Sequence, residues 1–112
     1  MKINNNAYGG FIITKNVNNG RPVRYSYREK KENPVLNGWV LLSCDDTQEY
    51  VNDTANFMIV GATTIHKLAP AMLEIFDAPY GTDLCWIYKR NKHIGFYDLI
   101  GDKEVTVDEI LG

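Results

Sequence analysis

Apolar and polar residues alternate along the first part of the chain with the two-residue period of a strand. Residues 10–15 favour one strand, and residues 16–20 (Asn-Val-Asn-Asn-Gly) favour a turn. In the segment that follows, Val23, Tyr25 and Tyr27 share one face, while Arg24, Ser26 and Arg28 share the other. We therefore predict an antiparallel hairpin, with its tyrosines in the core and its arginines facing solvent or an acidic neighbour.

Two shorter runs are apolar at every position and predict buried strands. Residues 38–42 (Gly-Trp-Val-Leu-Leu) are typical of a strand deep in a sheet, and residues 57–60 (Phe-Met-Ile-Val) form a second run. Residues 82–88 and 93–99 predict another hairpin, because both are rich in aromatic residues that favour strands. Val105 and Val107 predict a short edge strand, with residues 108–111 as a frayed end.

Helical patterns occupy two stretches between these strands. Asp45 and Asp46 can cap a short helix that contains Glu49 and ends near residues 52–53. Residues 61–76 have a helical period interrupted by Pro70, which predicts one helix, a break near residue 69 and a second helical piece. The predicted core face of these two pieces comprises Ile65, Leu68, Met72, Leu73 and Phe76.

Together these elements predict an α+β fold, with a mainly antiparallel sheet of five to six strands and two or three short helices packed on it. The chain has 112 residues and no repeat or linker, so we expect residues 1–112 to form a single domain. Its apolar runs are far shorter than the ~20 residues that cross a bilayer, and its N-terminus lacks the apolar region of a secretory signal. We expect a cytoplasmic protein without membrane contact, in which Cys44 and Cys85 remain thiols in the core.

Charge is unevenly distributed along the chain. Residues 1–42 contain seven Lys or Arg and two Glu, whereas residues 43–85 contain one Lys and seven Asp or Glu. Arginines and tyrosines interleave over residues 24–28, as they do in single-strand nucleic-acid platforms. However, the predicted strand turns these tyrosines away from the arginines, and the net charge is −2. We therefore expect no nucleic-acid partner.

The sequence contains no recognisable catalytic or metal-binding motif. Cys44, His66, Cys85 and His93 lack the spacing of structural zinc ligands. No nucleophile motif surrounds Ser43 or Cys44. We predict no catalytic residues, no metal and no other cofactor.

Four carboxylates, Asp45, Asp46, Glu49 and Asp53, lie within nine residues. Helix capping explains such a cluster without any function, because aspartates at a helix start complement its unpaired N–H groups. A partner-binding face is the second interpretation, and a catalytic or cation site is the third.

The order of several short landmarks resembles immunity protein family 33, also known as domain of unknown function family 2185. The landmarks are Gly9-Gly10, Tyr27-Arg28-Glu29, Gly38-Trp39, residues 43–46, Glu49-Tyr50, Asn52-Asp53 and residues 77–81 (Asp-Ala-Pro-Tyr-Gly). The resemblance spans residues 9–88 and implies a small bacterial protein that neutralises a cognate toxin. It brings no catalytic residues. Cys44 departs from the family pattern, which has a glycine before the acidic pair.

Two hypotheses from different classes follow. The first is a non-catalytic immunity protein that binds a toxin through an acidic face formed by Asp45, Asp46, Glu49, Tyr50 and Asp53, where carboxylates attract a basic partner and Tyr50 anchors it. The second is a cytosolic small-molecule-binding or regulatory module that uses a cleft near Trp39, Asp77 and Tyr80. An enzyme is the third hypothesis, and the sequence leaves a homodimer open.

Overall fold

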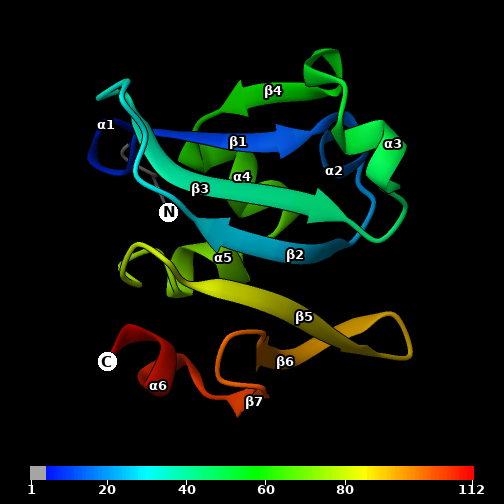
Figure 1. Cartoon of the computed structure of the whole chain (residues 1–112), viewed down its shortest axis with the longest axis vertical. Coiled ribbons are helices and arrows are strands. Elements are labelled where there is room, and N and C mark those ends of the chain that lie inside the picture. The colour runs from blue at the N-terminus through cyan, green and yellow to red at the C-terminus, as the bar shows by residue number, and fades with distance from the viewer. Residues whose placement is uncertain (1–4) are drawn as a thin grey trace.

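The computed structural model describes residues 5–112, in which seven strands form one mixed sheet (Figure 1). The strands are β1 (Gly10–Thr14), β2 (Val23–Arg28), β3 (Leu36–Ser43), β4 (Phe57–Val60), β5 (Asp83–Lys89), β6 (Lys92–Asp98) and β7 (Lys103–Val105). Their order is β4-β1-β3-β2-β5-β6-β7, and β1 and β3 are parallel whereas the other neighbours are antiparallel. The α+β class is confirmed, but the prediction of five to six strands was too low.

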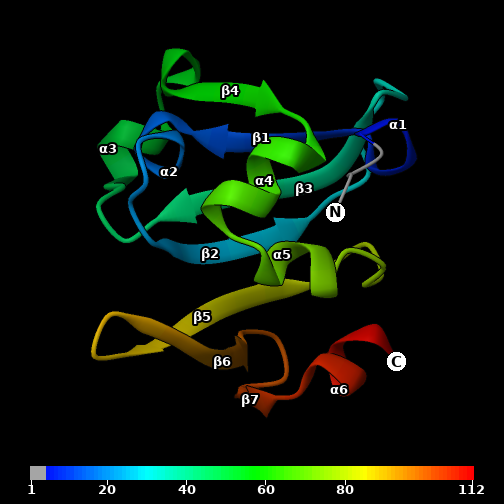
Figure 2. The ribbon, with the colours of Figure 1, turned by 180° about the vertical axis from the view of Figure 1, so that it is seen from behind.

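The helices are short and more numerous than predicted. They are α1 (Asn5–Tyr8), α2 (Lys15–Asn18), α3 (Gln48–Val51), the 3-10 helix η1 (Thr54–Asn56), α4 (Ala62–Leu68), α5 (Ala71–Glu74) and α6 (Val107–Leu111). The predicted break at Pro70 is confirmed, because α4 ends before Ala69 and α5 follows Pro70. Both helices lie on the same face of the sheet (Figure 2). Within residues 5–112, no helix combines the length and apolarity needed to cross a bilayer.

The predicted hairpin between residues 10–15 and 22–28 is wrong, because β3 lies between β1 and β2. The intended turn forms α2, which Thr14 caps by accepting a hydrogen bond from the Val17 N–H. The residues after α2 pass the end of β3, where the Cys44 N–H donates to the Pro22 carbonyl at 3.1 Å. This connection is long enough to span two strand spacings, about 10 Å, so β1 and β2 need not be neighbours.

The predicted alternation of β2 is also wrong beyond Val23. The register of β2 against β3 shifts between Val23 and Tyr25, which is the signature of a bulge. After the shift, Ser26 and Arg28 face the helices, whereas Tyr25 is 37% exposed. Ser26 is fully buried and accepts a hydrogen bond from Trp86 Nε1 at 2.8 Å. The bulge therefore reverses which residues enter the core.

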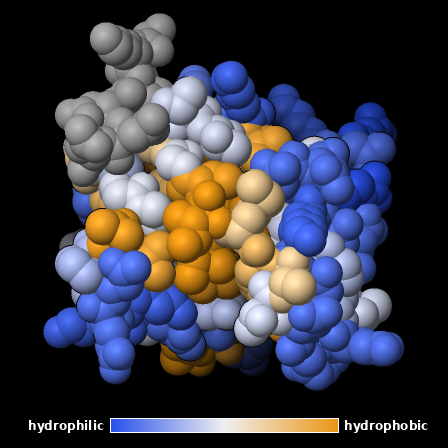
Figure 3. Space-filling model, turned by 90° about the horizontal axis from the view of Figure 1, so that it is seen from above, coloured by the Kyte–Doolittle hydropathy of each residue, from blue (hydrophilic) through white to orange (hydrophobic). Residues whose placement is uncertain are grey.

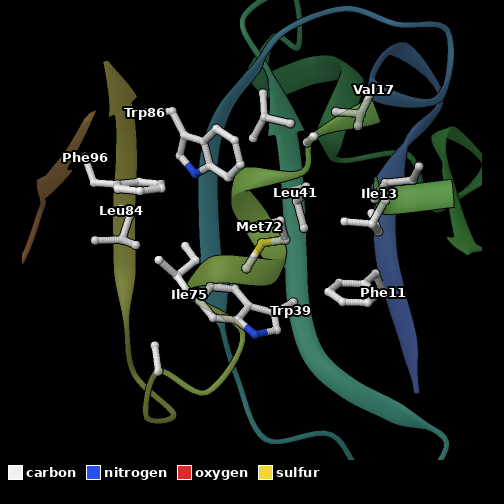
Figure 4. Close-up of a cluster of buried hydrophobic side chains, with 14 of the residues drawn as sticks. Phe11, Ile13, Val17, Trp39, Leu41, Met72, Ile75, Leu84, Trp86 and Phe96 are labelled. Carbon is white, nitrogen blue, oxygen red and sulfur yellow. The ribbon is translucent and has the colours of Figure 1, made fainter. Parts of the chain in front are cut away.

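One hydrophobic core fills the space between the sheet and the α4–α5 pair (Figure 4). Trp39 and Leu41 of β3, the strand predicted to be buried, are fully inaccessible to solvent. From the helices, Ile65 and Met72 are fully buried, and Leu68 and Leu73 pack partly buried against the core, as does Phe76 in the turn after α5. The predicted helix face is therefore confirmed, and Phe11, Ile13, Leu84, Trp86 and Phe96 complete the cluster from the strands.

The C-terminal half contains one confirmed element and one corrected element, and the prediction for the two cysteines is also corrected. The hairpin of β5 and β6 turns through Arg90 and Asn91, which both have positive φ angles, 54° and 65°. The end of the chain is not frayed, because Thr106 and Glu109 form a capping box at the start of α6. Neither cysteine lies in the core: Cys44 is exposed after β3, and Cys85 is half-buried opposite Tyr25.

Candidate functional site

The acidic segment predicted as a contact face lies where β3 ends and α3 begins. Asp45 is exposed and forms an ion pair with Arg21, from the segment that precedes β2. This hydrogen bond with the Arg21 guanidinium lowers the pKa of the Asp45 carboxyl. Arg21 thus neutralises part of the negative charge that the sequence placed here.

Asp46 shapes the turn and does not cap the helix, which corrects the sequence interpretation. Its Oδ2 accepts a hydrogen bond from the Ser43 N–H at 2.7 Å, and its Oδ1 accepts one from Asn16 Nδ2 at 2.8 Å. The cap of α3 is Thr47, whose hydroxyl accepts from the Tyr50 N–H. Asp46 therefore ties α2 to the end of β3 and is less available to a partner.

The remaining predicted contact residues differ in their exposure and in the hydrogen bonds that they already make. Asp53 is exposed and caps η1 by accepting from the Ala55 N–H at 2.9 Å. Tyr50 is half-buried, and its carbonyl accepts from Asn56 Nδ2. Glu49 is exposed in the first turn of α3, and no hydrogen bond or ion pair holds it within residues 5–112. Glu49 is therefore the carboxylate best suited to meet a partner.

The second predicted location, near Trp39, Asp77 and Tyr80, is organised around Arg28. The Arg28 guanidinium donates to the carbonyls of Phe76 and Ala78 at 2.9 and 2.8 Å, and to that of Asn37 at 3.0 Å. It also lies 4.8 Å from the ring centroid of Tyr80. We call Arg28 and the residues it contacts, Asn37, Trp39, Phe76, Ala78 and Tyr80, the Arg28 cluster.

Trp39 offers no surface to a ligand. Its side chain is fully buried, and its Nε1 donates to the Phe76 carbonyl at 2.9 Å. Asp77 and Tyr80 are exposed in the turn that follows α5. The sequence interpretation missed the role of Arg28, which it expected to face solvent or an acidic neighbour, because the bulge in β2 is not visible in the alternation.

A cavity of about 800 Å³ lies elsewhere, between the α4–α5 pair and the β5–β6 hairpin. Its lining includes Trp86, Tyr88 and His93 from the hairpin. Burial lowers the pKa of His93 and raises that of Tyr88 to about 12, so both side chains are neutral at physiological pH. His93 Nε2 is buried and has no hydrogen-bond partner among the described residues. From the sequence, His93 was considered only as a zinc ligand, and this cavity was not predicted.

Metal ligands do not converge in the described part of the chain. Within residues 5–112, no three His, Cys, Asp or Glu side chains are grouped so that they could hold a metal ion. Of the residues considered for zinc, His66 is exposed on α4, whereas His93 lies among the rings of Trp86, Tyr88 and Phe96.

Comparison with known proteins gives one match. A family model described as the immunity protein Imm33 domain matches residues 11–98, which include the acidic segment, the Arg28 cluster and the first six strands except Gly10. No curated protein and no solved structure matches the chain.

Proposed function

The chain belongs to the immunity protein Imm33 family, and we propose that it binds and neutralises a cognate protein toxin without catalysing a reaction. It acts in the cytoplasm, needs no cofactor, and engages neither nucleic acid nor membrane. The family match over residues 11–98 is the observation that carries this proposal.

The proposed contact face is the acidic segment, with Asp45, Asp46, Glu49, Tyr50 and Asp53. Glu49, Asp45 and Asp53 are exposed on it. Many toxins that attack nucleic acids are basic around their active sites, and an acidic surface would speed the encounter with such a toxin and cover its active site. Asp46 contributes chiefly by holding the segment in position.

The test begins with capture of partners from a lysate of the native cell on the immobilised protein, followed by identification by mass spectrometry. A captured toxin must inhibit growth when expressed alone, and co-expression of this chain must restore growth. A captured protein that is harmless when expressed alone would contradict the proposal.

The face is tested by charge reversal at Glu49, because this side chain has no partner to lose among the described residues. We expect Glu49→Lys to weaken toxin binding about tenfold, chiefly through slower association at low salt. Glu104→Lys is the matched control, since Glu104 is also exposed but lies on β7. Equal affinities of the two variants would remove the acidic segment as the contact face.

A second candidate function is a small-molecule-binding module, and the 800 Å³ cavity beside Trp86, Tyr88 and His93 favours it. A metabolite that binds there would raise the unfolding temperature by mass action. A thermal-shift screen of cellular metabolites tests this function, and a midpoint that no metabolite moves would exclude it for the compounds screened.

A further inference from the structure

Within the described residues 5–112, the outer edge of β4 has no neighbouring strand. β4 is the first strand in the sheet order, and its one partner in the sheet is β1. In Figures 1 and 2, the η1 turn projects beyond the start of β4, and no other element of residues 5–112 lies along its outer side. In an antiparallel pair, alternate residues direct their N–H and C=O groups away from the partner strand. The Phe57 N–H donates to the Thr54 carbonyl, and the other outward groups of β4 have no backbone partner within residues 5–112.

Nothing in the sequence of β4 blocks the addition of a strand. Residues 57–60 are all apolar and include no charge and no proline, which are the usual means of protecting an edge. The opposite edge of the same sheet is protected. There, β7 has three residues, two of which are the charged Lys103 and Glu104.

An apolar surface adjoins the unpaired edge (Figure 3). Ile59 is 59% exposed, although Ile13 and Phe11 of the neighbouring strand are fully buried. Gly10 makes this surface continuous, because a Cβ at Gly10 would lie 2.9 Å from Ile59 Cγ2 and 3.3 Å from Leu36 Cδ2. A side chain at residue 10 would separate Ile59 from Leu36. An added strand would therefore gain apolar contacts as well as backbone hydrogen bonds.

The length of the β4 edge, the charge of the segment before it and its position in the sheet indicate what binds there. This inference rests on the proposed function. We infer that the β4 edge accepts an extended segment of the cognate toxin that carries apolar residues at alternate positions and basic residues beyond them. η1 alone separates Asp53 from β4 in the chain, so the acidic segment leads directly into the β4 edge. A strand laid along β4 would end beside Asp53, which favours a basic residue there.

A second copy of the chain fits this edge less well than a toxin does. A four-residue strand is about 13 Å long, and pairing two such edges would bury far less than the ~1,200 Å² typical of a stable interface. A toxin that also contacts the acidic segment would add the missing area. The edge alone is therefore one part of a larger heterologous interface.

The experiment compares Ile59→Lys with Ile94→Lys in binding to the purified toxin that the capture identifies. The two isoleucines are matched, with exposed fractions of 59% and 58%, but Ile94 lies on β6, away from the β4 edge. We expect Ile59→Lys to raise Kd about tenfold or more and Ile94→Lys to change it less than about threefold. Ile59→Thr, which favours strands, serves as a second variant if the lysine disturbs folding.

Amide hydrogen exchange provides the readout specific to strand addition. In the complex, exchange at residues 57–60 should slow, whereas exchange at residues 103–105 should not change. Unchanged exchange in β4, an unchanged Kd for both Ile59 variants, or a dimer of the free protein that Ile59→Lys dissociates would each overturn the inference. If the wild-type chain neutralises the toxin and the Ile59 substitutions do not change Kd, the strand-addition inference is wrong while the proposed function stands. If the wild type binds no toxin, the proposed function fails and the inference with it.

Discussion

The Arg28 cluster and the acidic segment both contain residues through which the chain resembles its family, yet they are built in opposite ways. In the Arg28 cluster, a half-buried guanidinium donates to three carbonyls and lies against the rings of Trp39, Phe76 and Tyr80. In the acidic segment, the carboxylates lie near the surface, and Glu49 has no partner among the described residues. The difference indicates that one group of landmarks maintains the fold and the other is available for binding.

The largest expected effect is the loss of Arg28. Arg28→Ala should lower the free energy of unfolding by about 3 kcal/mol or more, because hydrogen bonds to a charged donor are strong and their carbonyls would be left without it. Urea unfolding measures this change. Arg24→Ala on the same strand is the control and should change stability by less than about 0.5 kcal/mol, since Arg24 is exposed. Equal effects of both variants would show that the Arg28 cluster does not hold the turn.

Gly38→Ala should have the next largest effect, a loss of about 2 kcal/mol. Gly38 has a φ of +92°, and a Cβ there would lie 2.4 Å from the Glu29 carbonyl oxygen, next to the Arg28 cluster. The matched control is Gly95→Ala, where a Cβ would meet no atom within 4 Å. The unfolding temperatures of the two variants measure this difference. A Gly38→Ala protein as stable as Gly95→Ala would show that an alanine at residue 38 is not strained.

Within the acidic segment, Asp46 and Glu49 should separate stability from binding. Asp46→Ala should cost about 1–2 kcal/mol in urea unfolding, because the Ser43 N–H and Asn16 Nδ2 lose their acceptor. Glu49→Ala should cost less than about 0.5 kcal/mol. When both variants are folded, Glu49→Ala should weaken toxin binding more than Asp46→Ala does. A Glu49→Ala variant that is less stable than Asp46→Ala would refute this division.

The smallest effects concern acid, where Asp83, near Arg28, and Asp45, in the acidic segment, should change stability in opposite directions. Burial, with nearby Asp98 and Glu29, raises the pKa of Asp83, which pairs with Tyr27 beside Arg28. The folded state therefore binds this proton first, and acidification towards about pH 4 should stabilise the protein through Asp83. The pKa of Asp45 is lowered by Arg21, so its contribution is present above about pH 4 and is lost as the pH falls through its folded-state pKa.

Two variants separate these responses in urea midpoints measured from pH 7 to pH 2.5. Asp83→Asn should remove the gain on mild acidification, and Asp45→Asn should flatten the loss at lower pH. Identical pH profiles for the two variants would mean that neither carboxyl has a folded-state pKa different from its pKa in the unfolded chain.

Local sequence patterns predicted where strands and helices form better than they predicted which strands pair. The β5–β6 hairpin was predictable because its strands are adjacent in sequence and its turn is two residues long. The pairing of β1 with β3 was not, because Ile12 and Val40 meet only when the whole sheet assembles. Likewise, the apolar run of residues 57–60 indicated a strand, but only the sheet order identifies it as an edge.

The exposure of the proposed contact segment was predictable, but the structural roles of its residues were not. The concentration of carboxylates in residues 45–53 correctly indicated a largely exposed segment. The sequence did not distinguish Asp46, which accepts hydrogen bonds from α2 and β3, from Glu49. That distinction depends on Asn16, thirty residues earlier in the chain.

The insertion of β3 between β1 and β2 has a consequence for synthesis. As the chain leaves the ribosome, β1 emerges first, but both of its neighbours, β3 and β4, are translated later. The nascent chain must therefore hold the apolar residues of β1 unpaired until at least residue 43 has emerged. Contacts that are remote in sequence slow folding, so we expect refolding in milliseconds to seconds rather than microseconds.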